Sequence, residues 1–337
     1  MNAVYIHIPF CKSICSYCDF CKMYLNDKFV LPYLNALASE IKSRYQGEKI
    51  KTLYIGGGTP SSLSSKHLNY LFDIVKLLDL EFLKEFTFEC NLNDINEELL
   101  DILKNNNVNR LSIGIESFNE KKLKFMNRSH TFKEAKEKIE LCRLKGFNNI
   151  NVDLIYALPK ESIAMLKSDL KQVLKLNVEH ISTYSLIVED NTMIGINNII
   201  PIDEETDEEM YNTIINMLTK KNYKHYEISN FAKEGFESLH NINYWLNNNY
   251  YGFGLSSHGY IGNIRYENTK NITKYNNLEF VKEEKLISTS DDMDNTIMLG
   301  FRLLKGINLQ NFYTNTGLNA SYMFYNCKEI TNISLGF

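Results

Sequence analysis

Short runs of apolar, β-branched and aromatic residues recur along the first half of the chain, with gaps long enough to hold a helix between them. Six such runs predict β-strands at 4–9, 52–58, 85–91, 110–117, 149–159 and 180–189. Between them, apolar positions with helical spacing predict helices at 31–44, 66–78, 97–104, 132–146 and 165–176. This repeated strand–helix order indicates an α/β fold with a parallel sheet and right-handed crossovers, either a barrel or part of one.

The pattern changes after residue 190, where the strand–helix rhythm stops and the chain becomes rich in Asn and Tyr. Later elements are predicted as a helix from the acidic run 203–209 to about Lys221, a strand at 223–231 and a helix at 295–304. The glycines of 251–260 are interpreted as turns and close backbone approaches. We therefore expect a first domain at 1–190 and a smaller α/β accessory domain at 191–337.

The composition is that of an ordinary globular protein. Its 337 residues are 44% hydrophobic and 23% charged, enough to build one large domain or two unequal ones. A net charge of −4 gives no overall electrostatic signature for binding nucleic acid or an anionic membrane. No run of about 18 apolar residues predicts a transmembrane helix, and the first ten residues lack a basic targeting start. We expect a cytoplasmic protein that recognises its partners locally.

Four of the seven cysteines lie in the stretch CKSICSYCDFC, directly after the first predicted strand. In a reducing compartment, clustered cysteines more often ligate metal or do redox chemistry than form structural disulfides. Cys11, Cys15 and Cys18 have the spacing C-x3-C-x2-C on a loop at the carboxyl end of a strand, where parallel sheets carry their chemistry. Three thiolates on one loop can hold three corners of a four-iron cubane and leave the fourth iron open.

Two other interpretations of the cysteine loop remain. A closed zinc site would need a fourth ligand, either Cys21 or His7. A thiol–disulfide motif is also compatible with the C-x-x-C spacings of the loop. The isolated cysteines are interpreted as small core residues: Cys90, Cys142 and Cys327.

A glycine-rich segment and three acidic residues add to the candidate site. GGGTP at 56–60 ends the second predicted strand and lets a ligand approach the backbone closely. It matches neither a dinucleotide fingerprint nor a P-loop. The next three strands each carry one acidic residue in an apolar run, at Glu89, Glu116 and Asp153. Each alone is compatible with a hydrogen-bonded core carboxylate, but three on successive strands favour a shared site.

In order and spacing, YIHIPFCKSICSYCDF, IGGGTPS, NRLSIGIESF and DLIYALP resemble radical S-adenosylmethionine (SAM) proteins related to oxygen-independent coproporphyrinogen III oxidase. The chain is most similar to the haem-chaperone branch, the HemW type. The resemblance, over about residues 4–306, implies a radical SAM partial (β/α)6 barrel with an accessory domain. It also implies a [4Fe–4S] cluster on the C-x3-C-x2-C cysteines, with SAM on the free iron. One electron from the cluster, supplied by an unidentified donor, then gives methionine and a 5′-deoxyadenosyl radical.

The resemblance also implies which residues bind SAM. These are Tyr5, Tyr17, Gly57, Gly58, Thr59, Glu89, Glu116, Arg128 and Asp153. Five of them match positions that contact a second SAM in the oxidase: Gly58, Thr59, Glu116, Arg128 and Asp153. Glu116 stands where the family usually has Gln, and this departure bears on whether a second SAM binds here.

Two features favour the chaperone branch over the oxidase. Oxidases have a further cysteine two residues after the third cluster ligand and a long amino-terminal extension, whereas this chain has Phe20 there and ten residues before Cys11. The segment HNINYW matches the HNxxYW motif, which is implicated in haem binding in the chaperones. The implied haem-binding residues are His240, Asn241, Tyr244 and Trp245. A histidine can ligate haem iron, and the two aromatic rings offer flat apolar surface for a porphyrin.

The resemblance thus implies a chaperone that binds haem and passes it to haem-accepting apoproteins. The alternatives are a coproporphyrinogen III oxidase, which decarboxylates propionate side chains, and a non-catalytic metal-binding module. Relatives usually continue beyond the equivalent of 306–308 into a longer carboxyl-terminal region, whereas here 309–337 remain. We therefore expect the terminal helical module to be shortened or absent.

Overall fold

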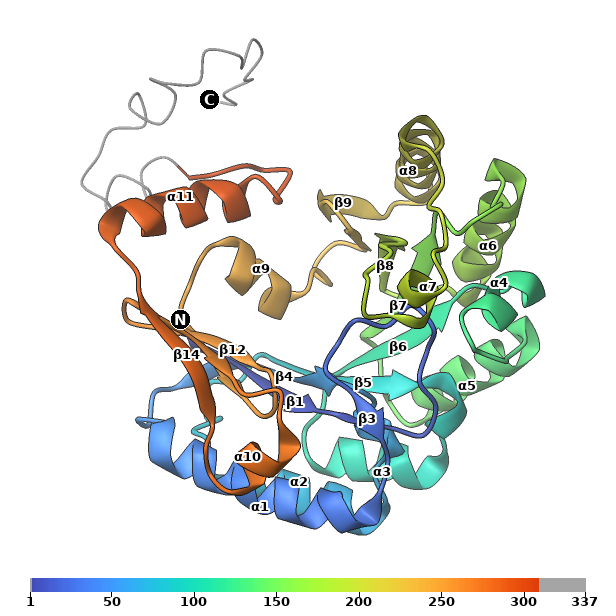
Figure 1. The fold of residues 1–337 in the computed structure, drawn as a ribbon. Helices are drawn as coiled ribbons and strands as arrows, with labels where there is room; N and C mark the ends of the chain where they lie inside the picture. The colour runs from blue at the N-terminus through green and yellow to red at the C-terminus, as the bar shows by residue number, and fades with distance from the viewer. Residues whose placement is uncertain (1, 309–337) are drawn as a thin grey trace.

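One curved sheet of twelve strands forms the centre of the computed structural model, which describes residues 2–308 (Figure 1). Its order is β14-β13-β12-β11-β1-β4-β5-β6-β7-β8-β10-β9. The strands are β1 Asn2–Ile8, β4 Ile50–Gly57, β5 Glu85–Asn91, β6 Arg110–Glu116, β7 Ile150–Tyr156, β8 His180–Ser185, β9 Lys224–Glu227, β10 Asn230–Ala232, β11 Tyr250–Phe253, β12 His258–Ile261, β13 Ile264–Asn268 and β14 Val281–Leu286. A separate parallel pair, β2 Phe10–Cys11 and β3 Met23–Tyr24, brackets the cysteine loop.

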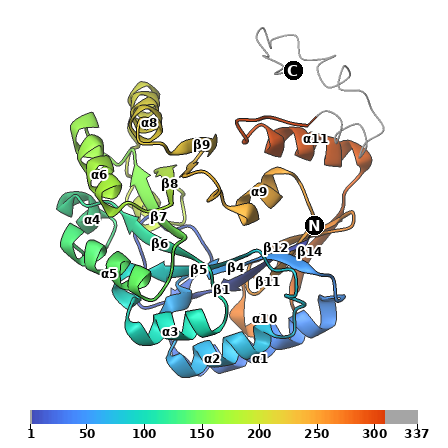
Figure 2. The same cartoon turned by 180° about the vertical axis from the view of Figure 1, so that it is seen from behind.

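Helices lie on both faces of this sheet, most of them on the outer face (Figures 1 and 2). They are α1 Asp27–Arg44, α2 Ser65–Val75, α3 Glu97–Asn105, α4 Glu120–Phe125, α5 Phe132–Leu144, α6 Ile163–Leu176, α7 Met193–Ile196, α8 Glu204–Thr219, α9 Leu239–Trp245, α10 Ile272–Asn276 and α11 Thr289–Gly300, with 3₁₀ turns at Pro60–Ser62 and Leu92–Asp94. Figures 1 and 2 show α1, α2, α3, α5 and α6 on the convex side, whereas α9 lies on the concave side. No helix within residues 2–308 is long and apolar enough to cross a membrane.

The six predicted strands form the parallel core of the sheet, which confirms the α/β partial-barrel fold. β1 and β4 to β8 pair in parallel in the order β1-β4-β5-β6-β7-β8. The later part of the chain extends the same sheet at both edges, because β11 pairs in parallel with β1 and β10 pairs antiparallel with β8. The division into domains at residue 190 stays a prediction.

Three expectations for the later chain differ from the structure. The strand predicted at 223–231 is a hairpin of β9 and β10 with a register shift between its arms. The last helix, α11, begins earlier than predicted because Ser288 and Asp291 form a capping box at its start. The glycine-rich stretch 251–260 contains most of β11 and β12 and not turns alone. The predicted close backbone approach is confirmed at Gly252, where a Cβ would lie 1.8 Å from the His258 carbonyl oxygen.

The two faces of the parallel strands differ in polarity. Successive side chains on a strand point to opposite faces. The outward positions pack in one apolar core with the helices and include Leu53, Ile55, Phe86, Phe88, Leu111, Ile113, Val152 and Leu154. Cys90 and Cys142 are buried in the same core as expected, whereas Cys327 and the carboxyl-terminal region 309–337 lie outside the described residues. Inward positions such as Ser112 and Asp153 are polar and line a cavity.

Candidate functional site

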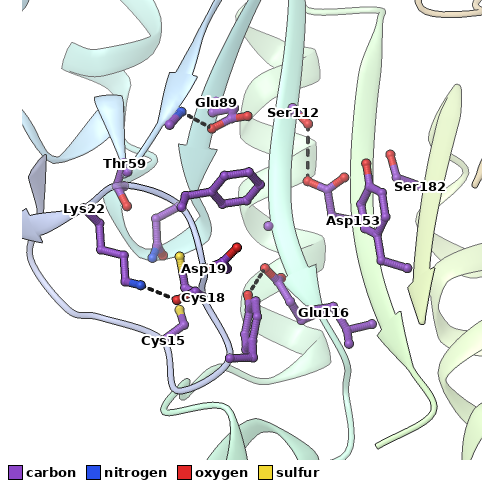
Figure 3. Close-up of a pocket in the computed structure, with 18 of the residues that line it drawn as sticks. Cys15, Cys18, Asp19, Lys22, Thr59, Glu89, Ser112, Glu116, Asp153 and Ser182 are labelled. Atoms are coloured by element: carbon purple, nitrogen blue, oxygen red, sulfur yellow. Dashed lines mark hydrogen bonds between the residues drawn. The ribbon is translucent and has the colours of Figure 1, made fainter. Parts of the chain in front are cut away.

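A cavity of about 480 Å³ lies inside the partial barrel, against the cysteine loop. Most of the predicted site residues line it: Cys11, Cys15, Tyr17, Cys18, Gly57, Gly58, Thr59, Glu89, Glu116, Arg128, Asp153 and Asn241. Figure 3 shows the carboxylates of Glu89, Glu116 and Asp153 on neighbouring strands, facing the loop with Cys15 and Cys18. The other predicted residues lie outside this lining: Tyr5, His240, Tyr244 and Trp245. The structure therefore brings the predicted cluster and most of the predicted SAM residues into one space.

The cysteine loop is closed at its base and fastened to the barrel rim. The β2–β3 pair closes it, and Leu25 N donates to Cys11 O at 2.8 Å. On the other side, Ser16 Oγ donates to Phe125 O at 2.7 Å and Asn127 Nδ2 donates to Ile14 O at 2.8 Å. These bonds hold the thiols on the side of the loop that faces the cavity.

Two of the three thiols, those of Cys11 and Cys18, ionise less readily than a free cysteine. Burial raises the pKa of Cys11 to about 11, and burial also raises the pKa of Cys18, with Lys22 opposing the shift. Thr59 Oγ1 lies 3.4 Å from Cys11 Sγ and donates to it. Metal binding would remove the thiol protons, because thiolates are the ligating form.

The chemistry of this donor set fits a cubane better than a single ion. Within residues 2–308, no group of three His, Cys, Asp or Glu side chains is arranged to hold one metal ion. A cubane takes one thiolate per iron, so its three ligands need not converge on one point. His7 has both ring nitrogens engaged, with Cys21 O at 2.7 Å from Nε2 and Tyr5 Oη at 3.0 Å from Nδ1. The Cys21 side chain is outside the cavity lining and hydrogen-bonds to Ser256.

The glycine segment lies where no side chain would fit. Gly57 has φ +114°, and a Cβ there would lie 2.5 Å from the His7 ring. A Cβ on Gly58 would lie 2.7 Å from the backbone of Pro9. The segment therefore packs directly against the strand that leads into the cysteine loop, and Gly57 N still donates to Glu89 Oε2 at 3.0 Å.

Glu89 is a carboxyl group that titrates near neutrality. Tyr54 Oη donates to its Oε1 at 2.7 Å, while Gly57 N binds the other oxygen. Burial raises the pKa of Glu89 to about 7, with Tyr54 opposing the shift. Asp153 adds to the rise through like-charge repulsion. A cationic ligand in the cavity would therefore favour the ionised form of this side chain.

Glu116 and Arg128 form a buried ion pair with unused hydrogen-bonding capacity. Arg128 Nη2 lies 2.9 Å from Glu116 Oε1, which also accepts from Tyr17 Oη at 2.8 Å. Glu116 has φ +62° and follows a register shift between β6 and β7, which turns its side chain into the cavity. The buried atoms Glu116 Oε2 and Arg128 Nε have no partner, so a polar ligand has groups to bind here.

Asp153 belongs to a hydrogen-bond chain that crosses the barrel. Asn151 Nδ2 donates to it at 2.9 Å and Ser112 Oγ at 3.3 Å, and Asn151 Oδ1 lies 2.6 Å from His180 Nδ1. Tyr226 Oη continues the chain to His180 Nε2 at 2.8 Å. Several inward residues were missed at the sequence level, although the alternation of polar and apolar positions marks them: Arg110, Ser112, Asn151 and Ser182.

Helix α9, which carries the whole HNINYW segment, is anchored by a carboxylate of the barrel. Glu85 accepts from the backbone N–H groups of Leu239 and His240 at 2.9 and 3.0 Å, and from Ser238 Oγ at 3.3 Å. These are free N–H groups at a helix start, where a negative charge is favourable. Of the four residues that the resemblance implies bind haem, only Asn241 lines the cavity described above.

His240 is held in a closed hydrogen-bond arrangement. It is 1% exposed, with Thr52 Oγ1 at 3.0 Å from Nδ1 and Tyr244 Oη at 2.9 Å from Nε2. Burial lowers its pKa to about 3, so the ring is neutral. Trp245 lies under the Arg302 guanidinium at 4.4 Å, and its buried Nε1 has no partner. In this conformation neither ring nitrogen of His240 is free to bind iron.

The comparisons with known proteins match this geometry. The model of the radical SAM superfamily matches residues 5–173, which contain the cysteine loop, the glycine segment and the three carboxylates. The heme chaperone HemW of Lactococcus lactis is 40% identical over 321 residues, which cover 92% of this chain and 84% of that protein. The HemW of Bacillus subtilis is 37% identical over 96% of this chain and 89% of the relative. The chain belongs to the heme chaperone HemW family of radical SAM proteins.

Membership of this family confirms the resemblance seen in the sequence. The HemW of Escherichia coli is 34% identical and extends the match to a third organism. Among solved structures, the coproporphyrinogen III oxidase of E. coli, a radical SAM enzyme, has a TM-score of 0.84 at 22% identity. That match covers 96% of this chain and 80% of the oxidase. At this identity the likeness shows the fold. The radical SAM family implies a [4Fe–4S] cluster and SAM, and the donor set of the cysteine loop is compatible with that cluster.

Proposed function

We propose that this protein binds haem and delivers it to apoproteins. The observation that carries the proposal is the family: a heme chaperone HemW is 40% identical, and the match covers 84% of that protein. The HNINYW segment supports it, because α9 packs against β4 and places Asn241 in the cavity that the cysteine loop lines.

The cluster and SAM belong to the same proposal. Cys11, Cys15 and Cys18 would hold the [4Fe–4S] cluster, which supplies one electron when it is bound. Glu89 presents a carboxyl group beside the backbone of Gly57, where a ligand ammonium or hydroxyl finds acceptors. The other predicted SAM residues would orient the rest of the molecule: Tyr5, Tyr17, Gly58, Thr59, Glu116, Arg128 and Asp153.

The haem residues require a local rearrangement. The neutral imidazole of His240 is the form that ligates iron, but it must first leave Thr52 and Tyr244. Trp245 is the last residue of α9 and is half-buried, and its ring faces Arg302. We propose that haem binding opens α9 enough to present His240, together with the aromatic surfaces of Tyr244 and Trp245.

The test uses anaerobically reconstituted protein. Haem titration followed by Soret absorbance should show saturable binding, and mixing with an apo-globin should transfer the haem. His240→Ala should weaken binding by about tenfold or more, whereas His67→Ala on α2, a histidine bonded to Ser64, should leave it unchanged. Absence of saturable haem binding would refute the proposal.

Two further outcomes identify the alternatives. Incubation with coproporphyrinogen III, SAM and a reductant should yield no vinyl product, and clear turnover would instead establish an oxidase. Colourless protein with stoichiometric zinc after reconstitution would establish a non-catalytic metal-binding module. The expected brown protein, with absorbance that responds to SAM, supports the radical SAM site.

A further inference from the structure

Arg110 is a buried cation in the cavity with almost no hydrogen-bond partner. It is the first residue of β6, is 2% exposed and lines the cavity. Its Nη1 lies 3.5 Å from Thr87 Oγ1, at the limit of a hydrogen bond, and its buried Nε has no partner. Within residues 2–308, no carboxylate lies within 4.0 Å of its guanidinium. A guanidinium has five N–H donors, and burying it unpaired is costly.

The acidic side chains around Arg110 are engaged elsewhere. Glu85 binds the start of α9, and Glu89 accepts from Tyr54 and Gly57. Asp153 accepts from its hydrogen-bonded neighbours on β6 and β7. Burial raises the pKa of Asp153, and Arg110 is among the groups that oppose the rise, so the two interact at a distance without a direct bond. The barrel therefore contains a positive group that its own carboxylates leave unpaired.

The position of Arg110 places it far from the cysteine loop. It lies at the amino end of β6 and Glu116 at the carboxyl end, and six residues of extended strand span about 20 Å. Both residues line the cavity, as does Asn241 of the HNINYW segment. An anion that pairs with Arg110 must therefore belong to a ligand that reaches deep into the barrel.

We infer that Arg110 is a binding subsite for a carboxylate of the ligand in this cavity. A planar guanidinium pairs with a carboxylate through two parallel N–H···O bonds, and the free donors of Arg110 allow this. The identity of the ligand rests on the proposed function, and the carboxylate we assign to Arg110 is a propionate of haem, because SAM on the free iron would lie at the distant cysteine loop.

The experiment compares ligands with and without the carboxylate. Reconstituted wild type, Arg110→Gln and Arg110→Met are titrated with haem and haem dimethyl ester, and with SAM and decarboxylated SAM. For the ligand that reaches Arg110, the affinity ratio of acid to neutral analogue should fall by about tenfold or more in both variants. Arg143→Gln, which removes an ion pair with Glu179 outside the cavity, should keep the wild-type ratios.

The outcomes separate the Arg110 subsite from the proposed haem-binding function. A changed haem ratio supports the subsite for a propionate, whereas a SAM ratio that changes instead would overturn this assignment. If neither ratio changes, the inference is wrong. Wild type that binds no haem would refute the proposed function, while thermal unfolding would still test whether the protein leaves Arg110 unpaired.

Thermal unfolding without ligands gives a second, independent readout. Arg110→Met should raise the midpoint, because an apolar side chain of similar length replaces an unpaired buried charge. A lowered midpoint would show that the protein itself pairs Arg110, which would overturn the inference even if Arg110→Gln failed to fold.

Discussion

Thr52→Val should strengthen haem binding if His240 ligates the iron. Thr52 lies on β4, far from the HNINYW segment in sequence, but its Oγ1 is 3.0 Å from His240 Nδ1. Valine keeps the shape but removes this partner, which leaves a buried nitrogen unsatisfied at a cost of about 1–3 kcal/mol. The closed arrangement loses that free energy, whereas the open one, with His240 on iron, does not. At 1.4 kcal/mol per factor of ten, haem affinity should rise by about 5- to 150-fold.

Haem titration of reconstituted protein measures this effect directly. Thr219→Val is the matched control, because Thr219 is an exposed residue of α8 whose Oγ1 donates to Ile215 O. Adding His240→Ala to Thr52→Val should abolish the gain, since the released ring is what binds. Unchanged affinity in Thr52→Val, together with unchanged affinity in His240→Ala, would refute the view that His240 leaves its closed position to ligate haem.

Three further predictions follow from buried charges. Burial raises the folded-state pKa of Glu89 from 4.5 to about 7, so the folded protein holds this proton more tightly than the unfolded chain does. The contribution of Glu89 to the free energy of unfolding is therefore largest below pH 4.5 and is lost as the pH rises through 7. Thermal unfolding without SAM should therefore show this pH dependence in wild type but not in Glu89→Gln. Glu116→Gln frees Arg128 from its ion pair, so equilibrium dialysis should show a second bound SAM; an unchanged stoichiometry would count against Glu116 as the block. Lys122→Met leaves two buried carboxylates without their cation and should lower the free energy of unfolding in urea by about 3–5 kcal/mol; a loss below 1 kcal/mol would contradict this.

The parallel barrel could be predicted because each of its strands is a contiguous run with local signals at both ends. The predicted strand at 85–91 matches β5, and that at 110–117 ends one residue beyond β6. The edge strands could not be found in this way. β14 is exposed along its whole length and carries four charged side chains in six residues, so it lacks an apolar pattern, and its partner β13 determines its place.

The cavity was only partly predictable for a similar reason. The cysteine motif and the acidic residues stand out within apolar surroundings, but Arg110 appears in sequence as the polar start of a strand. Its inward orientation follows from the register of β6 with β5, where Arg110 pairs with Thr87. The closed state of His240 depends on Thr52, 188 positions away in the chain, and no local pattern encodes that contact.

The most direct test of the account is whether the cluster has an open iron. Iron analysis and electron paramagnetic resonance of anaerobically reconstituted wild type should give about four iron atoms per chain. The signal of the reduced cluster should change when SAM is added, and Cys21→Ala should keep both properties while Cys15→Ala loses them. A reduced cluster whose spectrum ignores SAM, or one that Cys21→Ala destroys, would contradict the account.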